Sequence, residues 1–241
     1  MNVKYEQILI VILTVALIVV SGVFYILINE NKSQTPNMET VTKNAIGSTV
    51  EIICTTNDNA VESKGTGFIT SYNDKNIVVS NAHVILLNDT VFDVIVSRFY
   101  NSSIEYSLRV IAYDVNQDIS LMEFDDTTLS LKPLKLGDSS RLGYSQEVIT
   151  IGNALGYGLS STNGIISSPN VKINSGGEER SVIQTNININ RGNSGGPVLD
   201  MNGNVIGMMS FRLNNIMGTI QGISFAIPSN TIADYIEQIY E

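Results

Sequence analysis

The sequence predicts an all-β protein: two antiparallel six-stranded β-barrels with a C-terminal helix, preceded by a single N-terminal transmembrane helix. Three observations lead to this prediction. Short runs of β-branched and apolar residues recur with turn residues between them, a turn-rich stretch at 132–144 divides these runs into two sets, and an apolar segment without charges lies near the N-terminus. With 43% hydrophobic and only 15% charged residues among 241, the chain is able to bury a full core.

The first predicted element is a membrane helix at residues 8–28, where no residue is charged. A helix rises about 1.5 Å per residue, so this segment is long enough to cross a hydrocarbon core of about 30 Å. Lys4 and the amino terminus favour a cytoplasmic stub at residues 1–7, which places the rest of the chain on the extracytoplasmic side. The alternative is a cleavable signal peptide with its cleavage site after residues 19–21.

Residues 29–39 are polar and contain Pro36, so they are predicted to form a linker to a folded domain at residues 40–241. Within this domain we expect the first barrel at 40–135 and the second at 136–228. The strands expected in the first barrel are Thr49–Cys54, Gly67–Ser71, Ile77–Ser80, Val91–Ser97, Ile104–Tyr113 and Ile119–Phe124. Those expected in the second are Val148–Gly152, Thr162–Ser168, Val182–Thr185, Pro197–Leu199, Val205–Phe211 and Ile220–Ala226.

A helix is expected to complete the fold at residues 229–241. It follows Pro228, and either Ser229 or Thr231 is placed to cap its first turn. Apolar residues at helical spacing then fall on one face, as is typical of an amphipathic helix. These residues are Ile232, Ala233, Ile236, Ile239 and Tyr240.

Composition excludes several functions. The net charge is −9 and no run of Lys or Arg is present, so nucleic acid is not an expected partner. The single cysteine, Cys54, has no partner for an internal disulfide and is predicted to be a small core residue. The single histidine, His83, excludes a His-rich metal site, and any imidazole chemistry must pass through that position. We expect neither a metal nor another cofactor.

The most informative motif is G-N-S-G-G-P at residues 192–197, which places one hydroxyl among three glycines just before a short strand. Glycine allows the backbone to turn sharply and to come close to a ligand. With Ser194 as a nucleophile, the N–H groups of Gly192 and Ser194 would form an oxyanion hole. The alternative is a glycine-rich hairpin turn with an incidental serine.

A serine nucleophile needs a base, and the base needs an acceptor that orients it. His83 is the only imidazole and follows an apolar strand within S-N-A-H. Asp118 opens another apolar strand and is the better candidate for the acceptor, because Asp114 lies in the preceding turn, where an aspartate usually bonds its own backbone. The aspartates at 125 and 126 lie in a polar loop and are expected to be solvated.

Together, the motifs S-N-A-H, D-x-x-x-D-I-S-L and G-N-S-G-G-P resemble the HtrA (Deg) branch of the chymotrypsin-fold serine proteases, from about Thr40 to the end of the chain. The resemblance implies that His83 is the general base, Asp118 its orienting carboxylate and Ser194 the nucleophile. It also implies that the amides of Gly192 and Ser194 bind the oxyanion, and it suggests a homotrimer.

The resemblance implies a serine endopeptidase that cleaves unfolded or flexible proteins at a membrane surface, in protein quality control or regulated proteolysis. Members of the branch commonly continue into PDZ domains, whereas the sequence ends at Glu241, so the expectation is a membrane-anchored protease domain without one. The alternative is a catalytically silent protease fold that binds extended peptides as a chaperone or scaffold. A silent relative usually lacks a member of the triad, and here all three are present.

Substrate preference is predicted from one position. In chymotrypsin-like folds the floor of the first specificity pocket lies six residues before the nucleophile, which is Asn188 in this chain. A neutral side chain there provides no counter-charge for Lys or Arg, and the resemblance implies a preference for small aliphatic side chains.

Overall fold

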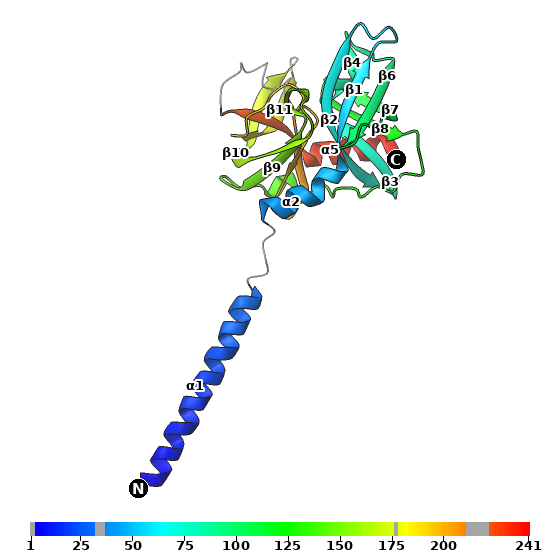
Figure 1. Ribbon diagram of the computed structural model, residues 1–241. Helices are drawn as coiled ribbons and strands as arrows, with labels where there is room; N and C mark the ends of the chain where they lie inside the picture. The colour runs from blue at the N-terminus through cyan, green and yellow to red at the C-terminus, as the bar shows by residue number, and fades with distance from the viewer. Residues whose placement is uncertain (1–2, 32–36, 176–177, 211–221) are drawn as a thin grey trace. The chain divides into compact units, whose positions relative to one another are not determined.

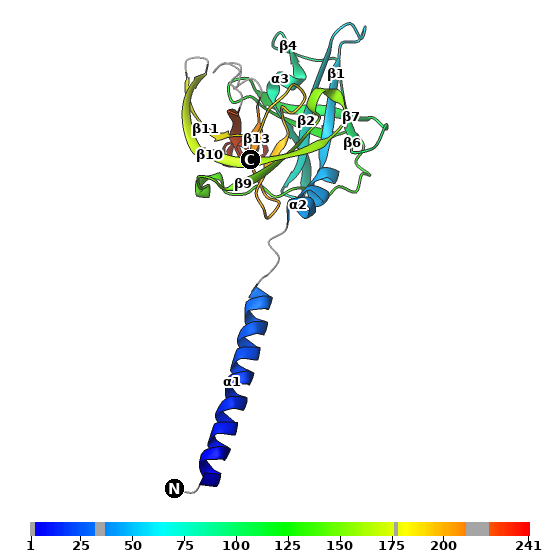
Figure 2. The same cartoon turned by 60° about the vertical axis from the view of Figure 1, so that its left-hand side comes forward.

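The computed structural model describes residues 3–31, 37–175, 178–210 and 222–241. The chain forms two units, Met1–Asn37 and Met38–Glu241, which we describe separately. Figure 1 and Figure 2 show both units from two directions.

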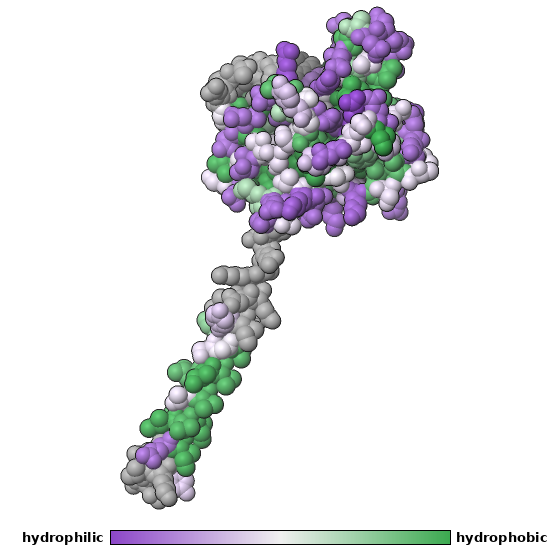
Figure 3. Space-filling model, in the orientation of Figure 1, coloured by the Kyte–Doolittle hydropathy of each residue, from purple (hydrophilic) through white to green (hydrophobic). Residues whose placement is uncertain are grey.

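The first unit contains one helix, α1 (Val3–Asn31). Its segment Gln7–Tyr25 has a mean hydropathy of 2.9 and no buried residue, so by length and composition it is able to cross a membrane. Figure 3 shows apolar side chains along the visible face of this helix. The hydroxyls of Thr14 and Ser21 donate to the carbonyls of Ile10 and Ile18, so both polar side chains find partners within the helix itself.

The second unit begins with a short amphipathic helix and a closed antiparallel barrel. The helix α2 (Met38–Ala45) buries Val41 and Ala45, and the 3₁₀ turn η1 (Ile46–Ser48) leads into the first strand. The barrel has the strand order β1-β2-β3-β8-β7-β6. Its strands are β1 (Thr49–Thr55), β2 (Glu62–Tyr72), β3 (Lys75–Ser80), β6 (Val94–Phe99), β7 (Tyr106–Asp114) and β8 (Ile119–Phe124).

A second closed barrel follows, with the strand order β10-β11-β14-β13-β12-β9. Two 3₁₀ turns, η2 (Ser139–Arg141) and η3 (Ala154–Gly156), lie before and after β9. The strands are β9 (Glu147–Gly152), β10 (Ser160–Ser175), β11 (Glu178–Thr185), β12 (Pro197–Leu199), β13 (Val205–Met209) and β14 (Ser224–Pro228). The predicted fold class is therefore confirmed.

Strands that are apolar on both faces explain how the barrels join. In β3, Val78 belongs to the core inside the first barrel, whereas Ile77 and Val79 belong to a cluster that also contains side chains of the second barrel. β9 shows the same division, since Val148 lies in the core of the second barrel and Ile149 in the shared cluster. A strand buried on both faces has a continuous apolar run instead of an alternating one.

The C-terminal helix α5 (Ser229–Tyr240) packs on this shared cluster through Ile232, Tyr235 and Ile236. The predicted apolar face is wrong at one end, since Ile239 is 36% exposed while Tyr235, not predicted to be buried, is 6% exposed. The predicted cap also differs: Pro228 is the N-cap residue, and the Ser229 hydroxyl instead donates to the carbonyl of Gly137.

Several short elements were not predicted from the sequence. These are α2, the single-turn helix α3 (Ala82–Ile85), and the hairpin of β4 (Leu86–Leu87) and β5 (Thr90–Val91). Some strand bounds differ too, since the strand predicted from Ile104 begins at Tyr106, and β10 extends to Ser175. One predicted strand ends at 211 and the next begins at 220, and both of these positions lie outside the described residues.

Candidate active site

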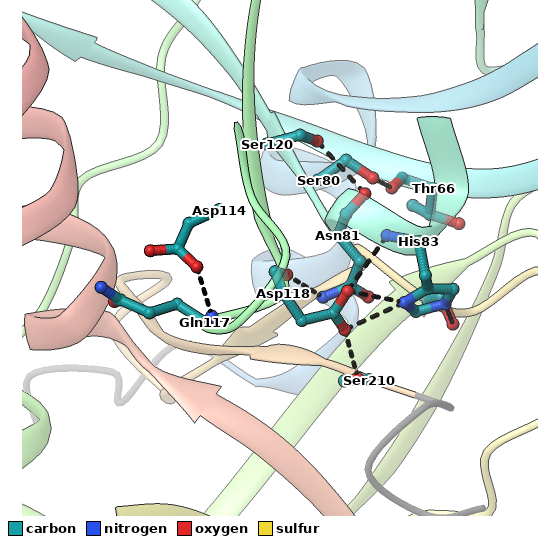
Figure 4. Close-up of polar contacts among 10 residues, drawn as sticks. Thr66, Ser80, Asn81, His83, Asp114, Gln117, Asp118, Ser120 and Ser210 are labelled. Carbon is teal, nitrogen blue, oxygen red and sulfur yellow. Dashed lines mark hydrogen bonds and ion pairs between the residues drawn. The ribbon is translucent and has the colours of Figure 1, made fainter. Parts of the chain in front are cut away.

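The three predicted catalytic residues come from three separate segments. His83 lies in the single-turn helix α3, three residues after the end of β3, and Asp118 immediately precedes β8. Both belong to the first barrel. Ser194 lies in the loop between β11 and β12 of the second barrel. The structure nevertheless brings all three side chains together, and Figure 4 shows the contact between His83 and Asp118.

The imidazole of His83 contacts both partners. Its Nδ1 lies 2.9 Å from each carboxylate oxygen of Asp118, and its Nε2 lies 3.1 Å from Ser194 Oγ. The backbone N–H of His83 donates to the same carboxylate at 3.1 Å. An ionised carboxylate only accepts hydrogen bonds, so it favours the tautomer with the proton on Nδ1 and leaves Nε2 as an acceptor facing the serine hydroxyl.

A fourth side chain completes the surroundings of the carboxylate. Asp118 is 1% exposed, and Ser210 donates its hydroxyl to Asp118 Oδ2 at 2.8 Å. Asn81 donates from Nδ2 to the Asp118 carbonyl at 3.0 Å, which helps to hold a backbone with φ of +57°. Neither Ser210 nor Asn81 was predicted as a site residue. A buried carboxylate needs such donors, because burial without hydrogen bonds is costly.

Two of the other aspartates considered as acceptors for His83 accept hydrogen bonds from neighbouring residues instead. Asp114 accepts the backbone N–H of Gln117 at 2.7 Å and thereby closes the turn before β8 (Figure 4). Asp126 is exposed and accepts hydrogen bonds from the hydroxyl and the N–H of Thr128, which lower the pKa of its carboxyl. Among these candidates, the structure places Asp118 against His83.

Two of the peptide groups before Ser194 are held by their carbonyl oxygens. The carbonyl of Arg191 accepts the N–H of Leu155 at 2.8 Å, and the carbonyl of Gly192 accepts the hydroxyl of Thr66 at 2.6 Å. In a trans peptide the N–H points away from the C=O. The N–H of Gly192 is therefore directed away from the turn that contains Leu155.

The third peptide group is held in the same way, since the carbonyl of Asn193 accepts the N–H of Gly196 at 3.0 Å. The N–H of Ser194 belongs to this peptide and is directed away from Gly196. Fixed carbonyls thus determine the directions of both amides that the sequence nominates as oxyanion donors.

The glycines of the motif are required by close backbone contacts. Gly192 has a φ of +98°, and a Cβ atom there would lie 1.9 Å from the carbonyl oxygen of Asn153. Gly195 has a φ of +83°, and its Cβ would lie 1.9 Å from the carbonyl oxygen of Thr66. A side chain at either position would displace the backbone around Ser194.

Two further residues were singled out in the sequence, Asn188 and Cys54. Asn188 is exposed in the irregular segment between β11 and β12, and its part in substrate binding stays a prediction. Cys54 is fully buried in β1, and burial raises the pKa of its thiol to about 12. A thiol with so high a pKa is a poor nucleophile.

Two closed antiparallel barrels with contacting Ser, His and Asp side chains between them define the class of trypsin-like peptidases. Comparison with protein families agrees, because the family described as a trypsin-like peptidase domain matches residues 65–208. The chain belongs to this family, in its HtrA-like branch.

Relatives and solved structures identify the branch. The chain is 34% identical over 183 residues to the serine protease Do-like HtrA of Lactobacillus helveticus, covering 73% of this chain and 43% of the relative. It is 34% identical over 168 residues to the periplasmic serine endoprotease DegP of Escherichia coli K12, covering 70% of this chain and 34% of the relative. The structure of the HtrA-type protease AlgW with a tripeptide aligns with a TM-score of 0.69 at 27% identity, covering 83% and 62% of the two chains. The chain thus spans less than half the length of either curated relative.

Proposed function

We propose that this chain is a serine endopeptidase that cleaves unfolded or flexible proteins through a covalent acyl-enzyme. The observation that carries the proposal is the continuous contact from the Asp118 carboxylate through the His83 imidazole to the Ser194 hydroxyl, with distances of 2.9 and 3.1 Å. The L. helveticus relative is named a serine protease and the E. coli relative a serine endoprotease, which supports the same reaction.

In this mechanism His83 Nε2 takes the proton of Ser194 as Oγ attacks the carbonyl carbon of the scissile bond. The tetrahedral intermediate then collapses, the C–N bond breaks, and His83 returns the proton to the departing amine. Water attacks the resulting ester with His83 again as the base, which releases the acid and restores Ser194. Asp118 remains ionised throughout and stabilises the imidazolium.

The oxyanion of each tetrahedral intermediate would bind to the amides of Gly192 and Ser194. Preorganised donors contribute strongly in such sites, because they need not reorient as charge develops. The three held carbonyls before Ser194 supply this preorganisation. Asn188 would line the first specificity pocket, where its neutral side chain provides no counter-charge for Lys or Arg, and the resemblance to the HtrA branch implies a preference for small aliphatic residues.

The proposal includes a location. Residues 8–28 would anchor the chain in a membrane, with the stub at 1–7 in the cytoplasm, a linker at 29–39 and the protease domain at 40–241 on the extracytoplasmic side. The uncharged apolar segment Gln7–Tyr25 supports the anchor, and the periplasmic relative supports the side. A homotrimer belongs to the same proposal, and sedimentation of the full chain in detergent tests it.

Labelling with a fluorophosphonate probe tests the reaction, because such probes react with activated serines. We expect the parent chain to be labelled and to cleave an unfolded protein, with losses of about 10⁶ in kcat for Ser194→Ala and for His83→Ala. The matched control is Ser130→Ala, which removes an exposed hydroxyl from the segment between β8 and β9. A parent chain that binds extended peptides without being labelled would instead support the peptide-binding alternative.

A further inference from the structure

A buried threonine of the first barrel contacts the loop that carries Ser194. Thr66 lies in β2 and is fully buried. Its hydroxyl donates to the carbonyl of Gly192 at 2.6 Å and accepts the backbone N–H of Asn153 at 3.0 Å. One side chain therefore bridges two loops of the opposite barrel.

The first of these contacts fixes the peptide between Gly192 and Asn193. Its carbonyl is held by Thr66, and its N–H donates to the Asn190 carbonyl at 3.1 Å. This peptide connects the amide of Gly192 to the amide of Ser194. Its rotation would change the angle between the two amides, so its orientation determines whether they converge on one oxygen atom.

The second contact acts on the neighbouring loop. Asn153 precedes η3, and Leu155 in that turn donates its N–H to the Arg191 carbonyl at 2.8 Å. Leu155 has a φ of +59°, which is unfavourable for a branched side chain and persists only where surrounding contacts hold it. By accepting the Asn153 amide, Thr66 supports the turn that orients the N–H of Gly192.

The backbone of Thr66 is itself held firmly. Its N–H donates to the carbonyl of Ser194 at 2.8 Å, and its carbonyl accepts the Ser80 hydroxyl at 2.7 Å. Figure 4 shows Thr66 and Ser80 beside His83. The hydroxyl therefore projects from a strand held at its own backbone toward the loop groups that it bonds, which is the arrangement a positioning side chain needs.

We propose that Thr66 is a positioning residue for the oxyanion hole, acting from the first barrel on the amides of Gly192 and Ser194. This inference rests on the proposed function. Thr66 touches no reacting atom, and it does not contact the carboxylate of Asp118 or the ring of His83 in any hydrogen bond found among the described residues. Its loss should therefore reduce the stabilisation of the transition state and leave proton transfer by His83 intact.

Thr66→Val tests the proposal, because valine keeps the shape and removes the hydroxyl. We expect kcat to fall about ten- to a hundredfold, less than the loss of a direct donor, with KM within about twofold and an unchanged pH profile. Thr66→Ser should restore most of kcat. Thr66→Ala, which adds no apolar bulk beside the polar groups, is measured in parallel in case the valine variant does not fold.

The matched control is Thr70→Val in the same strand. Thr70 is 2% exposed and donates its hydroxyl to the Leu134 carbonyl at 2.9 Å. Thr70→Val removes one buried hydrogen bond, whereas Thr66→Val removes two that reach the loops beside Ser194, so Thr70→Val should lower stability without changing kcat. An equal fall in kcat in both variants would show a general structural effect and overturn the proposal.

Hydrogen exchange provides a readout that is independent of turnover. Exchange at the Asn153 amide should accelerate in Thr66→Val and remain at the parental rate in Thr70→Val, because only the first variant removes its acceptor. Parental exchange, or parental kcat, in a folded Thr66→Val chain overturns this inference alone. A parent chain that takes no fluorophosphonate overturns the proposed function as well, so the two failures are distinguishable.

Discussion

Among single residues, Asp118 shows how the surroundings of a carboxylate determine whether it can orient the histidine. Its oxygens face His83 and accept the Ser210 hydroxyl, while the Asp114 carboxylate is used within its own turn. The sequence alone suggested this choice, because an aspartate in a turn usually bonds nearby backbone. Under the proposed mechanism, the two carboxylates should therefore differ in their importance for catalysis.

We expect Asp118→Asn to keep the shape of the site and to lower kcat by about 10⁴, because an amide would hold the imidazole in the wrong tautomer. Asp114→Asn should cost little, since an asparagine oxygen still accepts the Gln117 amide. Steady-state kinetics on one unfolded substrate compares the two variants. Equal losses, or full activity in Asp118→Asn, would mean that the wrong carboxylate has been assigned.

Site residues that the sequence did not reveal are those joined by long-range contacts. Ser194 and its glycines form one contiguous motif, so local pattern is sufficient to find them. Ser210 is 92 positions from Asp118, and Thr66 is 126 positions from Gly192. Contacts between such distant residues depend on the barrel topology, and a single serine or threonine in a β-strand region carries no signal of it.

Cys54 provides a pH-dependent prediction for the folded barrel. Burial raises the pKa of its thiol from 9.0 to about 12, so above pH 9 the unfolded chain loses a proton that the folded chain keeps. Stability should therefore fall as the pH rises from about 9 toward 12, by about 1 kcal/mol at pH 10. Denaturant unfolding of the parent chain and Cys54→Ala at pH 8 and pH 10 measures the difference. The same pH dependence in both chains would contradict the assignment.

Single elements could be predicted where burial imposes a pattern. The long apolar runs of β3, β8 and β9 follow from strands that face a barrel interior on one side and the shared cluster on the other. The helices α2 and α3 and the β4–β5 hairpin were missed because each is too short to establish a period. Short elements depend on the packing around them more than on their own propensity.

The start of α5 offers a test at this scale. Asn230 accepts the Ser139 N–H at 2.9 Å, donates its own N–H to Ser139 Oγ at 3.1 Å, and donates Nδ2 to Asp138 at 3.0 Å. These bonds fasten the helix to the segment that joins the two barrels.

We expect Asn230→Ala to lower the free energy of unfolding by about 1–2 kcal/mol, since it removes two side-chain hydrogen bonds and leaves the Ser139 amide without its acceptor. Gln238→Ala, an exposed position of the same helix, is the control and should change little. Urea denaturation measures both variants. Equal destabilisation would show that the helix, and not this junction, is what the substitution perturbs.

The whole molecule consists of two units that differ in where their apolar side chains lie. All three hydrophobic core clusters found among the described residues lie within Met38–Glu241, and none includes a side chain of α1. The folded domain therefore does not depend on α1 for its core. The apolar side chains of the segment Gln7–Tyr25 are exposed, which is costly in water and favourable in hydrocarbon.

This division predicts the behaviour of a truncated chain. The full chain should stay with membranes after carbonate extraction, because transferring α1 out of lipid would expose its apolar surface to water. A chain that begins at Met38 should be water-soluble and should react with the fluorophosphonate at the parental rate, since every residue of the proposed site lies beyond that point. Fractionation followed by labelling measures both properties, with the Ser194→Ala form of the truncated chain as the control.

Two outcomes would contradict this division. A mature N-terminus found at or near Gly22 would contradict the anchor and identify the segment as a cleaved signal peptide. Loss of labelling on truncation would show that α1 supports the site.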